Sequence, residues 1–229
     1  MDITVNLIEQ IYENDMHDLL IPEGSYAYII DRIKGQQWSK QIIVEEHGQL
    51  TYLLVCEDSS VDVEFVCEWE FAQIKVFAIF VGKKDTKITS RIIGNLRASE
   101  THADIYLLSL LGDESNVEVD GGVDIGPDIQ QASGHLMEEN LILGDKVTLK
   151  TLPMLDVRSN DVSASHGCRI DKVDADKLFY MTSKGIPQSE ANRLIVEGYV
   201  TNILENFTDL GEDAILAIKE DVIWKVVRV

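Results

Sequence analysis

The stretch VDVEFVCEWEFAQIKVFAIFVG, from Val61 to Gly82, decides the fold class of this chain. From Val61 to Cys67 every second residue is apolar, and acidic residues fill most of the positions between them. Side chains in a β-strand alternate between two faces, so we expect Cys67 to lie on the buried face of a strand. The second half is rich in β-branched and aromatic residues, which favour strands. The stretch therefore predicts two consecutive β-strands.

Strand-like pieces of this kind recur every ~8–12 residues from Tyr26 to about residue 170, with glycine or polar residues between them. Such spacing is typical of a β-sandwich, a β-barrel or a β-solenoid. Short turns such as Gly-Asp, Ser-Asn-Asp and Asp-Gly-Gly, and the lack of an Asn-Gly hairpin turn, favour the solenoid. The internal repeat is weak, but stacked coils need only inward apolar residues. The residues alone leave these architectures open.

The first twenty residues predict a short helix. Ile3, Leu7 and Ile11 recur at helical spacing with acidic residues between them. We therefore assign residues 1–25 to a short N-terminal helical segment and residues 26–170 to the β-core.

The pattern becomes helical again after the β-core. Asp174 is expected to cap a helix that stops at Gly185, and Pro187 to open a longer amphipathic helix that extends to Phe207. The tail after Gly211 fits either a last helix or a strand. Residues 171–229 therefore form a C-terminal helical region in this interpretation.

The composition excludes several classes of partner. The 229-residue chain carries 40 acidic and 20 basic residues, a formal net charge of −20, which repels phosphate backbones and anionic lipid surfaces. We therefore expect no nucleic acid or membrane partner, but rather a basic protein surface or a metal ion. Three cysteines without CxxC spacing indicate neither a disulfide framework nor a zinc ribbon. The N-terminus is also too acidic for a signal peptide. The cysteine pattern and the N-terminus together predict a cytoplasmic protein.

The segment ASHGCRIDKVDADKLFYMTSKGIPQSEANRLIVEGYV, from Ala164 to Val200, resembles the C-terminal signature of the SufB/SufD family, the scaffold components of the SUF iron–sulfur cluster assembly machinery. The resemblance begins upstream, at about residue 139. The matching positions are Ser165-His166-Gly167, Leu178-Phe179-Tyr180-Met181, Lys184-Gly185-Ile186, Glu190-Ala191, Glu197-Gly198-Tyr199 and, upstream, Thr151, Pro153, Leu155, Asp156, Asp161 and Val162.

This resemblance implies a right-handed parallel β-helix followed by a C-terminal α-helical region that docks a SufC-like ABC ATPase. It also implies pairing through the β-helix, with the chain itself or with a second SufB/SufD-like subunit, and a transient iron–sulfur cluster built near the pairing interface. Family members are not ATPases. The sequence has no GxxxxGK[ST] loop, so we expect no nucleotide to bind to this chain itself.

Three departures from the family make the chain a short, SufD-like form. Typical members are longer and carry more β-coils. The SufB branch has a cysteine that is proposed to hold the nascent cluster, and the corresponding position here is about Leu152. The SufB branch also has a glutamate directly after the histidine, where this chain has Gly167. Cys168 stands where the family usually has alanine, so the resemblance assigns it no role.

His166 is the first candidate metal ligand, since the resemblance relates it to the SufD histidine and neutral imidazole binds iron well. The alternative is that it bonds to backbone at a corner of the solenoid. Cys168 is a second candidate, because thiols suit iron and persulfide chemistry; the alternative is a small buried hydrophobe. Structural roles are expected for Cys56 and Cys67. Surface or turn roles are expected for the histidines at positions 102 and 135.

The amphipathic helix after Pro187 is expected to dock the ATPase partner, or else simply to cap the solenoid. The candidates for its exposed, partner-binding face are Glu190, Arg193, Glu197 and Asn202. No carboxylate pair stands out as an acid/base couple, which argues against a β-helical carbohydrate-active enzyme. The function predicted first is a non-catalytic SUF scaffold. The alternative is an adaptor of an ABC ATPase machine that holds no cluster itself.

Overall fold

The structure, a computed structural model, describes residues 7–12, 18–173 and 175–227. Its strands are β1 (Leu7–Tyr12), β2 (Leu19–Ile21), β3 (Tyr26–Lys34), β4 (Gln37–Val44), β5 (Gln49–Glu57), β6 (Ser60–Cys67), β7 (Gln73–Gly82), β8 (Lys87–Leu96), β9 (His102–Leu111), β10 (Asn116–Ile125), β11 (Gln130–Ile142), β12 (Thr148–Thr151), β13 (Met154–Val157) and β14 (Asp161–Lys172). The helices are α1 (Ala175–Ser183), α2 (Gln188–Leu204) and α3 (Glu212–Val227), with a 3₁₀ segment, η1 (Glu205–Leu210), before α3.

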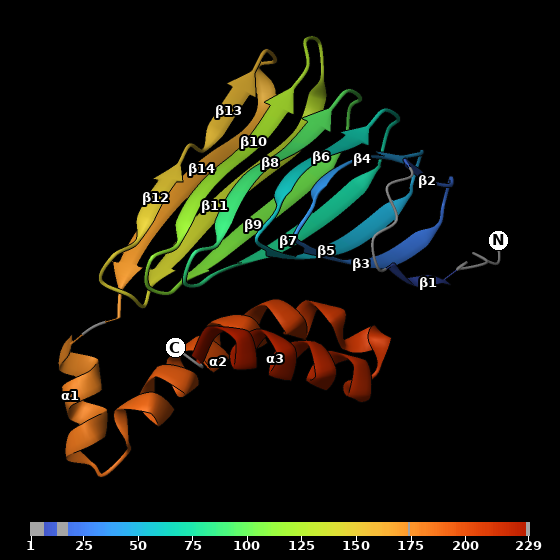
Figure 1. The fold of residues 1–229 in the computed structure, drawn as a ribbon. Coiled ribbons are helices and arrows are strands. Elements are labelled where there is room, and N and C mark those ends of the chain that lie inside the picture. The colour runs from blue at the N-terminus through green and yellow to red at the C-terminus, as the bar shows by residue number, and fades with distance from the viewer. Residues whose placement is uncertain (1–6, 13–17, 174, 228–229) are drawn as a thin grey trace.

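The strands wind into a parallel β-helix (Figure 1). Sheet A has the order β1-β3-β5-β7-β9-β11-β14, and sheet B has the order β12-β10-β8-β6-β4-β2, with β13 also paired with β10. The paired strands are parallel in both sheets. Because the chain alternates between the sheets, each coil contributes one strand to each of them. The predicted parallel β-helix with a C-terminal helical part is confirmed.

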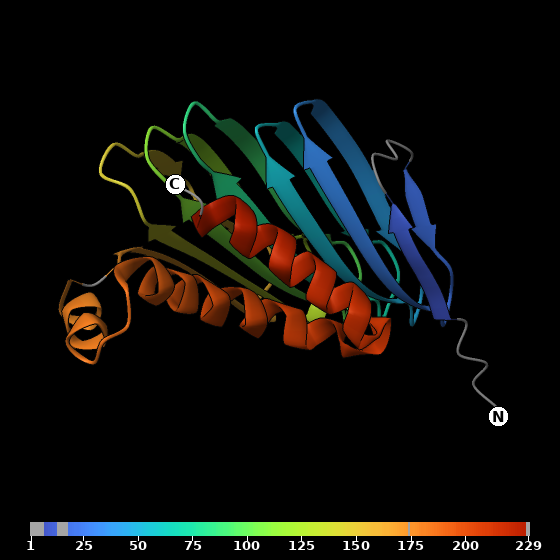
Figure 2. The same ribbon diagram turned by 60° about the horizontal axis from the view of Figure 1, so that its bottom comes forward.

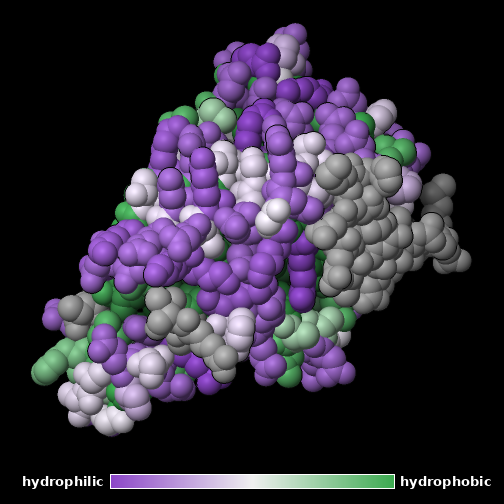
Figure 3. Space-filling view, in the orientation of Figure 1, coloured by the Kyte–Doolittle hydropathy of each residue, from purple (hydrophilic) through white to green (hydrophobic). Residues whose placement is uncertain are grey.

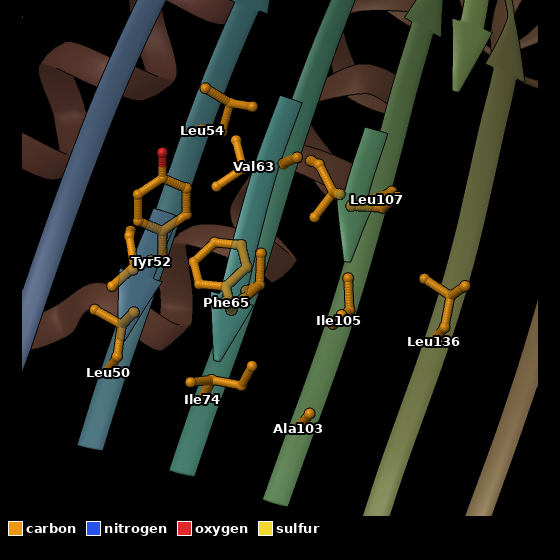
Figure 4. Packing of buried hydrophobic residues seen from close by; sticks show 14 of the residues in the cluster. Leu50, Tyr52, Leu54, Val63, Phe65, Ile74, Ala103, Ile105, Leu107 and Leu136 are labelled. Atoms are coloured by element: carbon orange, nitrogen blue, oxygen red, sulfur yellow. The ribbon is translucent and has the colours of Figure 1, made fainter. Parts of the chain in front are cut away.

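The main core lies between the two sheets. Tyr52 and Phe65 face each other across it, with ring centroids 5.1 Å apart, and aliphatic side chains fill the space around them (Figure 4). Cys67 is fully buried in this core, as the alternation predicts. The inward-facing row of each strand thus stacks on the row of the next coil, which is how a solenoid buries its apolar residues.

A second core joins the helices to the outer face of sheet A (Figure 2). Phe207 is completely buried, and its ring centroid lies 6.2 Å from that of Tyr28 and 5.6 Å from that of Phe77. Apolar residues of α2 and α3, such as Val200 and Val222, pack against the same face. The helices therefore cover one side of the β-helix.

Two clusters of charged residues, each around a buried carboxylate, link separate parts of the structure. Lys40 Nζ lies 3.0 Å from Asp31 Oδ2 between the sheets, both side chains are inaccessible to solvent, and the Tyr52 hydroxyl donates to the same oxygen over 2.7 Å. On the outside of sheet A, the Glu57 carboxylate lies within 4 Å of three lysine ammonium groups, one of them on α3. These are Lys83 at 2.5 Å, Lys34 at 3.2 Å and Lys225 at 3.5 Å.

The expected N-terminal helix is wrong where the structure describes it. Leu7–Tyr12 is strand β1, which pairs in parallel with β3, and Leu19–Ile21 is strand β2. Backbone pairing with a neighbouring coil overrides a helical spacing that rests on few residues. Residues 1–6 and 13–17 lie outside the described residues.

Two other boundaries also differ from the expectations. The predicted turn at Asp120-Gly121-Gly122 lies inside β10, where the first glycine lets Leu107 and Glu138 approach closely. The last strand continues to Lys172, beyond the boundary at residue 170. The tail after Gly211 is helical, which is one of the two alternatives expected for it. The expected cap Asp174 lies outside the described residues.

Hydrophilic residues cover most of the face of the β-helix that Figure 3 shows above the helices. On the outer face of sheet B, for example, the Arg91 guanidinium bonds to both Asp62 and Glu64. This polar face agrees with the acidic composition of the chain. Within the described ranges, no helix is long and apolar enough to cross a membrane.

Candidate functional site

The last strand of sheet A, β14, carries both predicted metal-ligand candidates at the open end of the β-helix. Val162 and Ala164 on this strand pack against the main core. Continuing the alternation, His166 and Cys168 point to the same inner side, where they stand beside Leu136 and Glu138 of β11 in the parallel register. No further coil covers them in the described chain, so both side chains are exposed. The structure therefore brings the two candidates together on one face.

Glu138 is a buried carboxylate next to these residues. Its side chain accepts the backbone N–H of Gly121 over 2.9 Å and the hydroxyl of Thr151. Burial raises the pKa of the Glu138 carboxyl above its ordinary value, although these hydrogen bonds and the nearby His166 partly counteract the shift. Glu138 is therefore a carboxyl group that takes up a proton more readily than a surface glutamate.

Cys168 is hydrogen-bonded to the same cluster. Its thiol donates to Thr151 Oγ1 over 3.9 Å, and the Asn140 amide Nδ2 lies 3.8 Å from its sulfur. Asn140 is buried, and its Oδ1 has no hydrogen-bond partner among the described residues. The site thus contains an exposed thiol, a relay hydroxyl, a buried carboxyl and an amide with an unused acceptor.

The other two thiols have a different environment. Cys56 and Cys67 are buried between the sheets, and burial raises the pKa of each thiol to about 12. They are structural hydrophobes, as the sequence predicts. Of the three thiols, Cys168 is the one accessible to reagents.

The residues predicted for surface roles lie on the outer face of sheet A. The His102 Nδ1 lies 2.7 Å from the Ser133 hydroxyl, and the His135 Nδ1 lies 2.8 Å from the Ser165 hydroxyl. Each pair links neighbouring coils. Neither histidine shares the inner face with His166.

Metal binding by His166 and Cys168 stays a prediction. Imidazole, thiolate and carboxylate groups are all good ligands for iron. Among residues 7–12, 18–173 and 175–227, however, no group of three His, Cys, Asp or Glu side chains is arranged to hold a metal ion. A complete ligand set from this chain is therefore not seen in the described part.

The open end also exposes apolar residues. Leu152, between β12 and β13, is half exposed, and its N–H donates to the Val119 carbonyl over 3.1 Å. Met154, Val157 and Ile170 are exposed at the same end. Within the described residues β14 has a partner on one side only, β11, so its other edge is unpaired. An unpaired strand edge beside exposed apolar residues is a typical site of chain pairing.

The predicted partner-binding residues lie on α2, but they are not all free. Arg193 and Asn202 are exposed. Glu190 lies 3.8 Å from Arg193, and Glu197 forms a 2.7 Å ion pair with Lys219 of α3, whose hydrogen bond lowers the pKa of the Glu197 carboxyl. Glu197 therefore contributes to the packing of α2 against α3.

The most exposed aromatic residues of the helical region are on α1, not α2. Phe179 is 73% exposed and Tyr180 is 64% exposed. Figure 1 shows α1 standing away from the sheets at the end of β14. Sequence reasoning missed Glu138, Asn140 and Thr151 as residues of the site, although polar residues at the inward positions of β11 interrupt the alternation and were a usable signal.

Comparisons with known proteins agree on one family. The family model described as "SUF system FeS cluster assembly, SufBD core domain" matches residues 39–199. The iron–sulfur cluster assembly protein SufD of Escherichia coli is 25% identical over 103 residues, which cover 45% of this chain and 24% of that protein. A SufBD family protein of Pyrococcus horikoshii is 31% identical over 112 residues, covering 49% and 24%. The iron–sulfur cluster assembly protein SufB of Bacillus subtilis is 29% identical over 103 residues, covering 45% and 22%.

The matches to these relatives span about a quarter of their own lengths. The match to the family core, in contrast, covers well over half of this chain and includes the strands that build the open end. The parallel β-helix and the C-terminal helices agree with this assignment. The chain belongs to the SufBD family of the SUF system for iron–sulfur cluster assembly.

Proposed function

We propose that this chain is a non-catalytic scaffold subunit on which iron–sulfur clusters are assembled in the cytoplasm. The observation that carries the proposal is that the SufBD core match covers a β-helix whose open end presents His166 beside a thiol and a carboxyl group. The cluster is the cargo of the site. His166 is the proposed ligand, with Cys168 as a second candidate.

The proposed scaffold pairs with a second chain at its open end. A second copy, or a second SufB/SufD-like chain, would cover the exposed edge of β14 and the apolar residues around Leu152. Pairing of strand edges satisfies backbone groups, and burial of the apolar residues stabilises the contact. Within the described residues, one chain does not provide a complete set of metal ligands. Two paired chains would each supply ligands to the same cluster.

The C-terminal helices are the proposed dock for a SufC-like ABC ATPase. ATP hydrolysis would then come from the partner. Phe179 and Tyr180 on α1 supply the exposed aromatic anchors that protein interfaces favour, and Arg193 and Asn202 supply polar contacts nearby on α2. The dock therefore extends beyond the four α2 residues that the sequence singled out.

The alternative is an adaptor that links the ATPase to other proteins without holding a cluster. One feature favours it: by the resemblance, the SufB-branch thiol corresponds to about the position of Leu152, and Leu152 is an exposed aliphatic residue. The two functions differ in whether this chain retains iron and sulfide.

Two measurements test the proposal. Co-purification with a SufC-like ATPase is expected for the wild type and for Leu216→Ala, an exposed position on α3, but weakened at least tenfold in Phe179→Ala/Tyr180→Ala. Anaerobic reconstitution with iron and sulfide should give a cluster absorption that falls in His166→Ala. An unchanged yield in that variant removes His166 as a ligand, and no cluster in the wild type favours the adaptor. If the purified chain neither associates with the ATPase nor changes its ATP turnover, both proposed functions are overturned.

A further inference from the structure

One edge of the β-helix carries exposed aromatic residues that belong to neither core. It is formed by the turns that follow the strands of sheet B, which lie along the upper rim in Figure 1, away from the helices. The turn between β6 and β7 includes Glu68-Trp69-Glu70-Phe71, in which Trp69 is 42% exposed and Phe71 is 37% exposed. The exposed His47 of the preceding turn stacks on Phe71, with ring centroids 4.7 Å apart and an interplanar angle of 6°. The two turns thus share one flat aromatic surface.

Phe71 occupies a backbone position that does not favour a bulky side chain. Its φ is 61°, in the left-handed region, which glycine enters without strain and asparagine or aspartate enters most easily among the other residues. The residue two before each strand of sheet A from β3 to β11 has this conformation; the other four are Gly24, His47, Glu100 and Asp128. Folding of the turn therefore does not explain the phenylalanine, whose ring is left at the surface.

Carboxylates lie on the same turns and keep their negative charge. They belong to Glu23, Glu45, Glu46, Glu68, Glu70 and Glu100, on four successive turns. Among the described residues, none of these six pairs with a lysine or an arginine. Arg97 of the fourth turn bonds to Asp124 and Asn95 instead. On the opposite edge, in contrast, Glu57 and Glu114 each lie within 4 Å of at least two lysine ammonium groups.

We propose that this edge, made of Glu23, residues 45–47, residues 68–71 and Glu100, is a docking surface for an arginine-rich segment of a partner protein. Guanidinium groups stack on aromatic rings and also bond to carboxylates, so they match both features of the surface. The net charge of −20 attracts such a segment at long range.

The size of the surface fits a short extended segment. Neighbouring coils lie ~4.8 Å apart, so the four turns span about 14 Å, which an extended chain of about four or five residues covers. Alternate side chains of an extended chain point to the same side. Arginines at every second position of the segment therefore face the docking surface together.

The docking surface is separate from the proposed cluster site and from the proposed ATPase dock. Strand β7, which follows the Phe71 turn, lies three strands from β14 in sheet A, a distance of about 14 Å. The helices pack on the outer face of sheet A rather than on these turns (Figure 2). An arginine-rich partner can therefore bind while both other surfaces are occupied, and the inference does not depend on the proposed function.

Fluorescence anisotropy with a fluorescein-labelled Arg-Ser-Arg-Ser-Arg peptide tests the proposal on the whole chain. We expect saturable binding at about 0.1 M salt that is lost toward 1 M, since the Debye length falls from ~10 Å to ~3 Å. The double variant Trp69→Ser/Phe71→Asn should weaken binding about fivefold or more, because each exposed cation–π contact contributes about two- to fivefold. Asparagine fits the left-handed backbone, so this variant should stay folded by circular dichroism. The Lys-Ser-Lys-Ser-Lys peptide, of equal charge, should bind more weakly than the arginine peptide.

A matched pair of variants separates this surface from the overall charge. Glu68→Gln/Glu70→Gln removes two carboxylates from the docking surface and should weaken binding about twofold or more. Glu205→Gln/Glu220→Gln removes two exposed carboxylates from the helical region and should leave binding nearly unchanged. Equal weakening in the two variants means that only the net charge attracts the peptide, and it overturns the docking surface. This comparison decides the question even if the aromatic variant does not fold, since both pairs of glutamates are exposed.

Three other results would also overturn the inference. The wild type does not bind the arginine peptide, or a folded Trp69→Ser/Phe71→Asn variant binds it as tightly as the wild type does. The third is that spermine displaces the peptide as effectively as unlabelled peptide does. A polyamine supplies positive charge without guanidinium groups, so that result would exclude a protein segment as the ligand that the surface selects.

Discussion

Replacing Phe207 by alanine should detach the helical region from the β-helix. Phe207 is the one residue of η1 whose ring meets two aromatic rings of sheet A, those of Tyr28 and Phe77. It is completely buried in the second core, so nothing but a cavity would replace the ring. The substitution therefore tests whether the helices are an integral part of the fold.

The expected loss is about 4–5 kcal/mol of unfolding free energy. Phe→Ala changes in protein cores cost ~3–5 kcal/mol, and two ring pairs worth ~0.5–1.5 kcal/mol each place this site in the upper part of that range. Phe179→Ala is the matched control. It removes the same atoms from a side chain that is 73% exposed, so its effect should stay within about 0.5 kcal/mol.

Urea unfolding measures both variants. Circular dichroism reports on the whole chain, while tryptophan fluorescence reports on Trp38 between the sheets, on the exposed Trp69 after β6 and on Trp224 of α3. With a slope of up to about 3 kcal/mol per M, the midpoint of Phe207→Ala should fall by more than about 1 M. If the unfolding free energies of the two variants differ by less than about 1 kcal/mol, the docking of the helices does not depend on the Phe207 ring, and the reasoning is wrong.

Three further substitutions test the buried groups. Lys40→Met should lower the free energy of unfolding in urea by about 3–5 kcal/mol, because it leaves Asp31 buried without the lysine cation. Adding Asp31→Leu should restore most of this loss. A double variant that is as unstable as the single one contradicts the reasoning. Burial alone would raise the pKa of the Glu57 carboxyl, but hydrogen bonds from Lys83 and Lys34 lower it below the ordinary value of 4.5. Its stabilisation is therefore complete above that value and lost as the pH falls, so Glu57→Gln should flatten the stability profile between about pH 5 and pH 3. Gly121→Ala places a Cβ 2.7 Å from Glu138 Oε1 and should lower the thermal midpoint, at a cost of ~1–3 kcal/mol, whereas Gly198→Ala, with nothing within 4 Å, should raise it.

The β-core was predictable because its signal is local. Alternation from Val61 to Cys67 correctly placed the last thiol inside, and strand-like spacing led to a solenoid as one of three architectures. The choice among them needed the family resemblance. One coil takes 23 residues from Tyr26 to Gln49 and another takes 31 from His102 to Ser133, so no fixed repeat appears in the sequence. The N-terminal segment was predicted as helix because few residues carry its pattern, while its strand forms by pairing with another coil.

The candidate site was predictable only in part, for the same reason. His166 and Cys168 are two residues apart, so alternation in one strand is enough to place them on one face. Glu138 and Thr151 reach Cys168 from other strands, and their contacts depend on the register between coils. Register is set by turn lengths and by packing, neither of which a single sequence displays.

The position of the site follows from the architecture of a solenoid. One inward row runs through Val76, Ile105 and Leu136 and ends in His166, and the next runs through Ala78 and Leu107 before Glu138 and Cys168. In an inner coil each of these polar groups would lie against side chains on both sides and would cost about 1–3 kcal/mol unless it were fully hydrogen-bonded. In the last coil one side is open, so the imidazole and the thiol keep contact with water. Glu138 lies one coil further in, where hydrogen bonds from the Gly121 N–H and the Thr151 hydroxyl offset the cost of its burial. Reactive side chains therefore cost least where the β-helix ends, which is also where we propose that a second chain pairs.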